Sequence, residues 1–138
     1  MLFSIIIPTY NRAGYLPKAI DSVIHQTFDD WELIVVDDGS KDNTKAVVGE
    51  IRKANINVRY IRFQRNYGKS AALNVGFERA SGDVVITMDA DLQDSPDEIP
   101  LLYKMITEDG YDLVSGWKQK RFDPITKTVP TKLYNWAA

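Results

Sequence analysis

Short apolar runs alternate along the chain with longer stretches in which apolar residues recur every three or four positions. A run rich in β-branched residues predicts a buried strand, whereas the three-to-four spacing predicts a helix. Strands are expected at residues 3–8, 31–37, 57–63, 82–89 and 111–116. Helices are expected at about 15–26, from a cap at 40–43 to about 53, at 68–80, and from Ser95 onward. The alternation predicts an α/β fold, with a mostly parallel sheet and helices on both faces.

In open parallel sheets, ligands bind beyond the carboxyl ends of the strands. Four polar segments follow the predicted strands, at residues 8–12, 37–40, 64–69 and 89–93. The last segment belongs to the stretch MDADLQD, which carries Asp89, Asp91 and Asp94 close together. Carboxylates this near to one another repel, so their clustering needs a physical reason.

We interpret the acidic stretch as a metal site. If the backbone continues extended past the strand, Asp89, Asp91 and Gln93 lie on one side of the chain, because side chains alternate with a period of two. Oxygen donors of this kind suit Mg²⁺ or Mn²⁺. The alternative is an acidic loop in which Asp94 or Ser95 caps the following helix.

Spacing excludes two other ligand-binding motifs. An EF-hand loop starting at Asp89 needs glycine at its sixth position and glutamate at its twelfth, where this chain has Asp94 and Pro100. The GKS at residues 68–70 resembles the end of a phosphate-binding P-loop, but Phe63 stands where the preceding glycine is required. No G-x-G-x-x-G is present, so neither an ATPase nor a dinucleotide enzyme is supported.

Composition and charge narrow the class of protein. The chain has 138 residues, 44% hydrophobic and 26% charged, which is typical of one globular domain. It has no cysteine and therefore no disulfide or thiolate metal site. A net charge of −2 argues against nucleic acid as the main partner. The final TKLYNWAA reads as the opening of a helix without a stop signal, so we expect this chain to be a fragment of a longer protein.

Four stretches carry a resemblance to a known family: SIIIPTYNR, VVDDGSKDNT, NYGKSAALNVGFERASGD and MDADLQDSPDEIP. In this order they resemble the successive signatures of family 2 glycosyltransferases over nearly the whole chain. MDADLQD is most similar to the branch of polyprenyl-phosphate (dolichol-phosphate) mannosyl- and glucosyltransferases. The resemblance implies a three-layer α/β/α A-type glycosyltransferase fold, truncated at the C-terminus, a UDP- or GDP-sugar donor and inversion at the anomeric carbon. Residues 1–138 would form the nucleotide-sugar-binding part of the catalytic domain.

By position, the resemblance also implies roles for individual residues. The donor would be bound by Pro8, Tyr10, Arg12, Asp37, Asp38, Gly39, Asn66, Lys69, Asp89 and Ala90. Asp89, Asp91 and Gln93 would hold Mg²⁺ or Mn²⁺, and Asp91 would be central to catalysis. The acceptor phosphate would be bound by Lys118, Arg121, Lys127 and Thr131. Lysine stands at 118 and 127 where the family tends to have arginine, and it offers a point charge in place of a bidentate fork. The alternative for this basic stretch is a solvated tail.

These roles predict a metal-dependent hexosyltransferase that moves a sugar from a nucleotide-diphosphate sugar to a polyprenyl phosphate. A phosphate monoester has a second pKa of about 6, so it is largely ionised at neutral pH and needs no general base. Two alternatives stay open: a non-catalytic nucleotide-sugar-binding module, and a transferase acting on a polysaccharide. A nucleotidyltransferase of similar architecture would need a glycine-rich loop near the first strand, and this chain lacks that loop. We expect a cytoplasmic location, at the face of a membrane that the protein reaches only through a part beyond residue 138.

Overall fold

The computed structural model describes residues 3–27, 30–92 and 95–116. In these ranges the chain forms one four-stranded sheet with the order β3-β2-β1-β4, and all neighbouring strands are parallel. The strands are β1 (Phe3–Thr9), β2 (Trp31–Asp37), β3 (Val58–Arg62) and β4 (Val84–Thr87). The helices are α1 (Leu16–Ile24), α2 (Thr44–Ala54), α3 (Lys69–Arg79) and α4 (Ile99–Thr107), the last preceded by a 3-10 turn, η1 (Pro96–Glu98).

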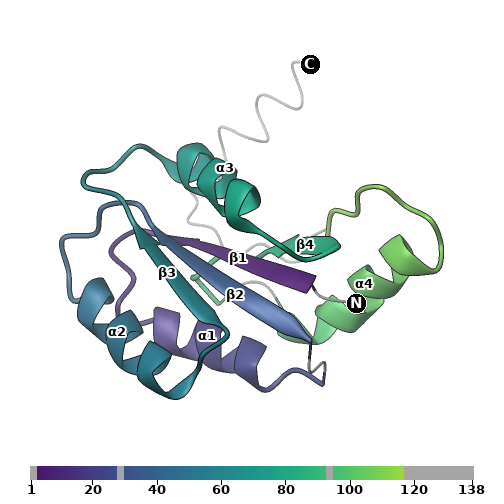
Figure 1. Ribbon diagram of the computed structural model, residues 1–138, viewed down its shortest axis with the longest axis horizontal. Helices are drawn as coiled ribbons and strands as arrows, with labels where there is room; N and C mark the ends of the chain where they lie inside the picture. Colours follow the sequence, from purple (N-terminus) through teal and green to yellow (C-terminus); the bar gives the residue numbers. More distant parts are fainter. Residues whose placement is uncertain (1–2, 28–29, 93–94, 117–138) are drawn as a thin grey trace, which may run out of the picture.

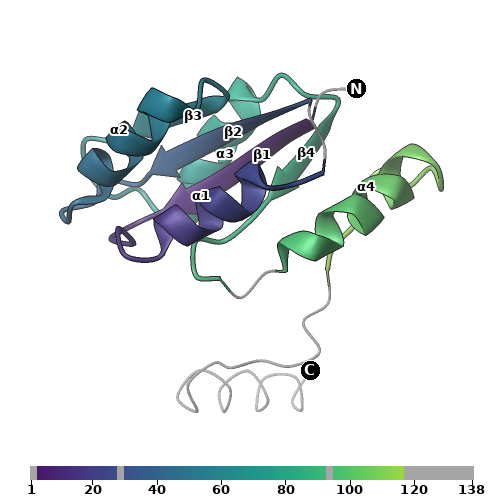
Figure 2. The same ribbon diagram turned by 90° about the horizontal axis from the view of Figure 1, so that it is seen from below.

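The helices cover the two faces of the sheet unequally. Figure 1 shows α1 and α2 on one face and α3 on the other, and Figure 2 shows α4 beside the β4 edge. Helices α1 and α2 connect β1 to β2 and β2 to β3, whereas α3 connects β3 to β4. The chain therefore changes face when it crosses back to the far side of β1, and this is the topological switch point of the sheet.

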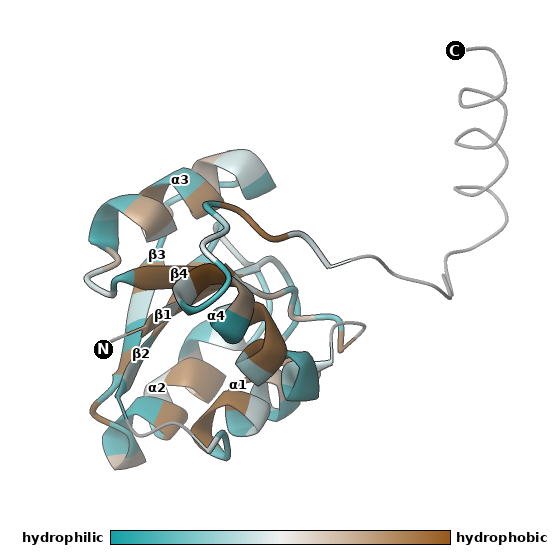
Figure 3. Ribbon diagram, turned by 90° about the vertical axis from the view of Figure 1, so that its right-hand side faces the viewer, coloured by the Kyte–Doolittle hydropathy of each residue, from teal (hydrophilic) through white to brown (hydrophobic). Residues whose placement is uncertain are grey.

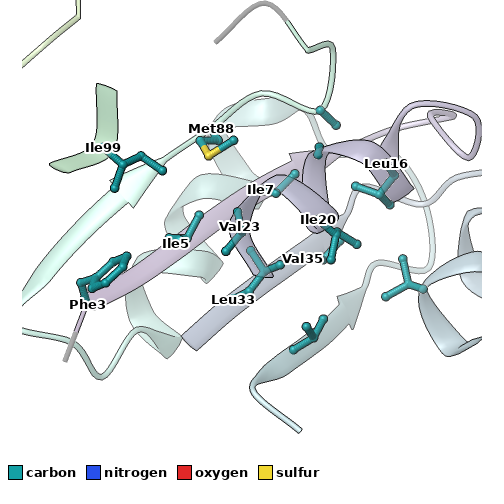
Figure 4. Packing of buried hydrophobic residues seen from close by; sticks show 14 of the residues in the cluster. Phe3, Ile5, Ile7, Leu16, Ile20, Val23, Leu33, Val35, Met88 and Ile99 are labelled. Atoms are coloured by element: carbon teal, nitrogen blue, oxygen red, sulfur yellow. The ribbon is translucent and has the colours of Figure 1, made fainter. Parts of the chain in front are cut away.

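The core follows from the alternation of side chains along the strands. Phe3, Ile5 and Ile7 point toward α1 and α2, and Figure 4 shows them packed with side chains of β2 and α1. Ile6 points to the opposite face, where it packs with Ile34, Val36 and Ala72 beneath α3. Figure 3 shows the apolar colour along the strands and also on parts of α1 and α4. Burial of each such large aliphatic side chain contributes about 1.5–3 kcal/mol, which holds both helical layers on the sheet.

A polar cluster joins the amino ends of the strands. The Glu32 carboxylate accepts hydrogen bonds from Ser4 Oγ at 2.7 Å, from Ser81 N at 2.6 Å and from Arg59 Nη1 at 2.9 Å. Burial alone would raise the pKa of Glu32, but the bonds from Ser4, Ser81 and Arg59 outweigh it and lower the pKa to about 2. The Glu32 cluster thus ties β1, β2, β3 and the entry to β4 together at the end opposite the strand tips.

The predicted fold class is confirmed, but the structure differs from two local predictions. Residues 111–116 form no strand, contrary to prediction, because Leu113 is 84% exposed and the segment pairs with none of the four strands. The helix expected from Ser95 onward is preceded by a 3-10 turn that begins at Pro96, and Ser95 makes no side-chain capping bond. Within the residues that the structure describes, no helix has both the length and the apolar character needed to cross a bilayer.

Candidate functional site

A polar cavity of about 350 Å³ opens at the carboxyl ends of the strands, where the switch point predicts a ligand site. Every one of the four segments that follow the predicted strands contributes to its wall. The lining residues are Pro8, Thr9, Tyr10, Arg12, Asp38, Asn66, Gly68, Lys69, Ala72, Asp89, Ala90 and Asp91. The structure thus brings nine of the predicted donor and metal residues to one cavity, which Asp89 and Asp91 share with Tyr10 and Asp38.

The wall after β1 is held by contacts with the loop after β2. Asn11 adopts a left-handed backbone with φ 51°. Its backbone N–H donates to Ser40 Oγ at 2.8 Å, and its side-chain oxygen accepts from Lys41 N at 2.8 Å. Tyr10 next to it is 40% exposed, so its ring is available to a ligand at the mouth of the cavity. The Arg12 guanidinium lies 5.9 Å from the Tyr15 ring centre, which orients it beside the opening.

Asp38 lines the cavity and also holds its opposite wall. Its carboxylate accepts the backbone N–H of Tyr67 at 2.7 Å and that of Gly68 at 2.9 Å. Gly68 has φ +96°, a conformation that side chains disfavour, and it leads directly into α3. Asp38 therefore fixes the position from which Lys69, the first residue of α3, reaches into the cavity.

Asp37 does not line the cavity. Its side chain is fully buried, and it accepts hydrogen bonds from Ser40 N at 2.8 Å and from Tyr60 Oη at 2.5 Å, with Arg62 Nε 3.3 Å away. Burial and the Asp37 carboxylate raise the pKa of Tyr60 well above its ordinary range. These contacts give Asp37 a structural function at the tip of β2, and its predicted contact with the donor stays a prediction.

Gly39 also lies outside the lining, and the structure shows why a glycine stands there. Its φ is +73°, and a Cβ atom would lie 2.5 Å from the carbonyl carbon of Arg65. The backbone that approaches Gly39 closely is thus that of Arg65, in the chain's own loop at residues 63–68. This loop carries Asn66 and Gly68 to the cavity.

The wall after β4 carries the acidic residues. The prediction that residues 89–93 continue extended is wrong, because the chain turns at Ala90 and Asp91, and Leu92 is left-handed with φ 61°. Asp89 and Asp91 nevertheless both face the cavity, with the buried Ala90 between them. Lys69 Nζ lies 2.5 Å from Asp89 Oδ1 and forms an ion pair across the cavity.

Asp89 and Asp91 are the described residues that could bind a divalent metal ion in the cavity. Among residues 3–27, 30–92 and 95–116, no group of three or more histidine or acidic side chains is arranged around one point. Asp89 and Asp91 supply two carboxylates of the type that Mg²⁺ and Mn²⁺ prefer. Asp89 already pairs with a cation, the Lys69 ammonium, so the position beside its carboxylate favours positive charge. The two carboxylates therefore fit a divalent ion, whose remaining ligands would come from elsewhere.

Five predicted residues lie outside the described part of the chain. They are Gln93 of the metal site and the acceptor residues Lys118, Arg121, Lys127 and Thr131. Conversely, Thr9, Gly68 and Ala72 line the cavity without having been predicted as donor or metal residues. Ala72 lies one helical turn after Lys69, so helical spacing could have indicated it. The hydroxyl of Thr9 is buried, and no described residue forms a hydrogen bond with it.

A parallel sheet with this switch point and a polar cavity at its strand tips is the architecture of the A-type glycosyltransferases, and the structure matches solved members of that class. Residues 4–137 match the family described as Glycosyl transferase family 2. The chain belongs to this family.

Two curated relatives are enzymes named undecaprenyl-phosphate 4-deoxy-4-formamido-L-arabinose transferase. The protein of Pseudomonas syringae pv. syringae is 40% identical over 138 residues, which is 97% of this chain and 41% of the relative. The protein of Proteus mirabilis is 40% identical over 136 residues, 96% of this chain and 41% of the relative. The chain thus spans about two fifths of the length of these relatives.

Two solved structures share the fold. The mannosyltransferase PcManGT from Pyrobaculum calidifontis, in complex with GDP-Man and Mn²⁺, superimposes with a TM-score of 0.70 and 28% identity, covering 77% of this chain and 32% of that one. The S. aureus TarS fragment in complex with UDP-GlcNAc superimposes with a TM-score of 0.70 and 28% identity, covering 90% of this chain and 37% of that one.

Proposed function

We propose that residues 1–138 are the nucleotide-sugar-binding part of an inverting glycosyltransferase whose acceptor is a polyprenyl phosphate. The observation that carries this proposal is the shared cavity, in which Tyr10, Lys69 and the Asp89–Asp91 pair face one space. The donor class is supported by the GDP-Man and UDP-GlcNAc bound in the two related structures. The acceptor class is supported by the relatives named as undecaprenyl-phosphate sugar transferases.

Each wall of the cavity has a distinct task in donor binding. Pro8, Tyr10 and Arg12 form the wall that would receive the base and ribose, since an aromatic ring and a guanidinium both stack on planar groups. Lys69 enters from the opposite wall and offers its ammonium to the diphosphate. Asp89 and Asp91 line the same cavity and would hold Mg²⁺ or Mn²⁺ together with Gln93.

In the reaction, a phosphate oxygen of the acceptor forms a bond to the anomeric carbon from the face opposite the nucleotide. The carbon–oxygen bond to the nucleoside diphosphate breaks, and its electron pair leaves with the diphosphate, so the configuration inverts. A divalent ion held by Asp89, Asp91 and Gln93 would supply positive charge that stabilises this leaving group. Lys118, Arg121, Lys127 and Thr131 would hold the acceptor phosphate, which is already ionised and needs no base from the protein.

A polyprenyl acceptor also places the protein in the cell. The lipid is membrane-bound, so the protein would act at a membrane surface, which we propose to be the cytoplasmic face, and would reach it through a part outside residues 1–138. The alternatives are a non-catalytic nucleotide-sugar-binding module and a transferase for a polysaccharide acceptor. Incubation of the intact chain with labelled UDP- or GDP-sugars, undecaprenyl phosphate and a polysaccharide acceptor separates the three. The proposal predicts labelled lipid, the polysaccharide transferase predicts labelled polysaccharide, and the non-catalytic module predicts no labelled product.

The donor site is tested by thermal unfolding with UDP or GDP, each with and without Mn²⁺. Ligand at a hundredfold excess over its dissociation constant stabilises the native state by about 2.7 kcal/mol. For a chain of this size that corresponds to a rise in Tm of roughly 5–10 °C. We expect this rise only with one nucleotide and Mn²⁺ together, and we expect Asp91→Asn to abolish it.

Asp83→Asn is the matched control. Asp83 is exposed and lies just before β4, at the end of the strand opposite the cavity, so its substitution removes one acid without touching the site. The nucleotide response of this variant should equal that of the unmodified chain. Equal responses in the Asp91→Asn and Asp83→Asn variants would contradict the assignment of the acidic pair to the donor site.

A further inference from the structure

The ion pair between Lys69 and Asp89 is the feature of the cavity with the clearest consequence for ligand binding. The Lys69 ammonium lies 2.5 Å from Asp89 Oδ1, and the two side chains are 59% and 35% exposed. Both residues line the cavity, from α3 and from the tip of β4. One carboxylate of the candidate metal site is therefore already paired with a cation supplied by the chain itself.

The backbone of Lys69 is anchored, whereas its side chain is long and partly exposed. Asp38 accepts the N–H groups of Tyr67 and Gly68, the two residues that precede Lys69. The Lys69 Cα is thus anchored to the tip of β2. Beyond that anchor, a flexible four-carbon stem carries the ammonium, and more than half of the side chain is in contact with solvent. A small rotation of the stem can move the charge within the cavity without moving the helix.

We propose that Lys69 is a built-in counter-cation of Asp89, which an incoming divalent metal displaces toward the diphosphate of the donor. This inference rests on the proposed donor site. A metal ion and an ammonium on the same carboxylate repel each other, so the metal-free cavity favours the pair and metal binding opposes it. A nucleoside diphosphate offers the released ammonium new anionic partners. The ion pair consequently weakens metal binding when no nucleotide is present, and this weakening is relieved when the nucleotide binds.

The proposal predicts opposite changes in the Mn²⁺ affinity and the nucleotide affinity of the Lys69→Met variant. Without nucleotide, the loss of the competing charge should tighten Mn²⁺ binding, by about three- to tenfold for a partly exposed pair. With Mn²⁺ present, the loss of the diphosphate contact should weaken UDP or GDP binding. The factor by which nucleotide strengthens Mn²⁺ binding, which is also the factor by which Mn²⁺ strengthens nucleotide binding, should fall. A lysine that merely contacts the donor would change only the nucleotide affinity.

The experiment measures Mn²⁺ affinity of the intact chain by electron paramagnetic resonance, without nucleotide and then with saturating UDP or GDP. Lys69→Arg keeps the positive charge and should stay within about twofold of the unmodified chain for Mn²⁺ alone. Lys53→Met is the matched control for net charge, because Lys53 forms an exposed ion pair with Glu50 on α2, outside the cavity. Its Mn²⁺ affinity should be unchanged.

Unchanged or weaker Mn²⁺ binding in Lys69→Met, with normal values for Lys53→Met, would overturn the proposal. The unmodified chain would still bind nucleotide with Mn²⁺ in that case. Failure of the proposed function has a different signature, since the unmodified chain would then show no Mn²⁺-dependent nucleotide binding. Circular dichroism of each variant checks the fold, which the exposed position of Lys69 should leave intact.

Discussion

Replacement of Glu32 by glutamine tests how strongly the Glu32 cluster stabilises the sheet. Glutamine keeps the shape and one acceptor oxygen, so bonds from Ser4 and Ser81 can persist. It loses the negative charge that faces Arg59 at 2.9 Å. The Glu32 side chain is only 12% exposed, whereas that of Arg59 is 43% exposed, so the pair is partly screened. The variant therefore removes the charge together with the acceptor for Arg59, while it keeps the acceptor for Ser4 and Ser81.

The magnitude follows from the pKa of Glu32. A fall from 4.5 in the unfolded chain to about 2 in the folded protein corresponds to up to ~3 kcal/mol of stability. Solvent screening at this edge reduces the expected loss in Glu32→Gln to about 1–2 kcal/mol at pH 7. Because the folded pKa is the lower one, the stabilisation is present above pH 4.5 and is lost as the pH falls toward 2. The difference between the two proteins should shrink over that range.

Urea unfolding at several pH values between 7 and 3 measures this difference directly. Glu50→Gln serves as the control, since its ion pair with Lys53 is more than 70% exposed on both sides and should contribute less than about 0.5 kcal/mol at any pH. A difference between Glu32→Gln and the unmodified chain that stays constant from pH 7 to pH 3 would refute the reasoning. An unchanged stability at pH 7 would refute it as well.

Two further substitutions test the tip of β2. Gly39→Ala should lower the free energy of unfolding by at least about 1–2 kcal/mol, because of its left-handed backbone and the 2.5 Å approach to Arg65. Gly49→Ala in α2, where an added Cβ would meet no atom within 4 Å, should instead raise the free energy of unfolding by about 0.5–1 kcal/mol. Equal changes in stability for the two alanine variants would disprove this account. Tyr60→Phe should cost about 1–3 kcal/mol by removing a donor to the buried Asp37, and thermal unfolding showing no loss would contradict the structural function of that bond.

The sequence was sufficient for the features that depend on repeating patterns. Strand–helix alternation predicted the parallel sheet and both helical layers, since buried β-branched runs and helical spacing are local signals. The rule that ligands bind at strand tips then selected all four segments that line the cavity. Topology alone thus predicted which parts of the chain would meet.

Contacts between those segments could not be predicted from local patterns. Alternation along β2 places Asp37 and Asp38 on opposite sides, but no local pattern indicates that Asp37 meets Tyr60 or that Asp38 meets the loop before α3. The turn at Asp91 likewise depends on the left-handed Leu92, a conformation that leucine seldom adopts and that no propensity indicates. The expected strand at 111–116 had the right composition, but a strand also needs a neighbour, which composition does not supply.

The strand order has a consequence for synthesis. A chain made from its N-terminus can pair β1 with β2 once residues 3–37 have emerged, and β3 can join at residue 62. The β4 wall, which brings Asp89 to the cavity, joins β1 only after a further crossover through α3. The nascent protein therefore acquires most of its hydrophobic core before it acquires the acidic wall, so a ribosome-bound intermediate that ends before β4 would be largely folded yet unable to hold a cation at that place.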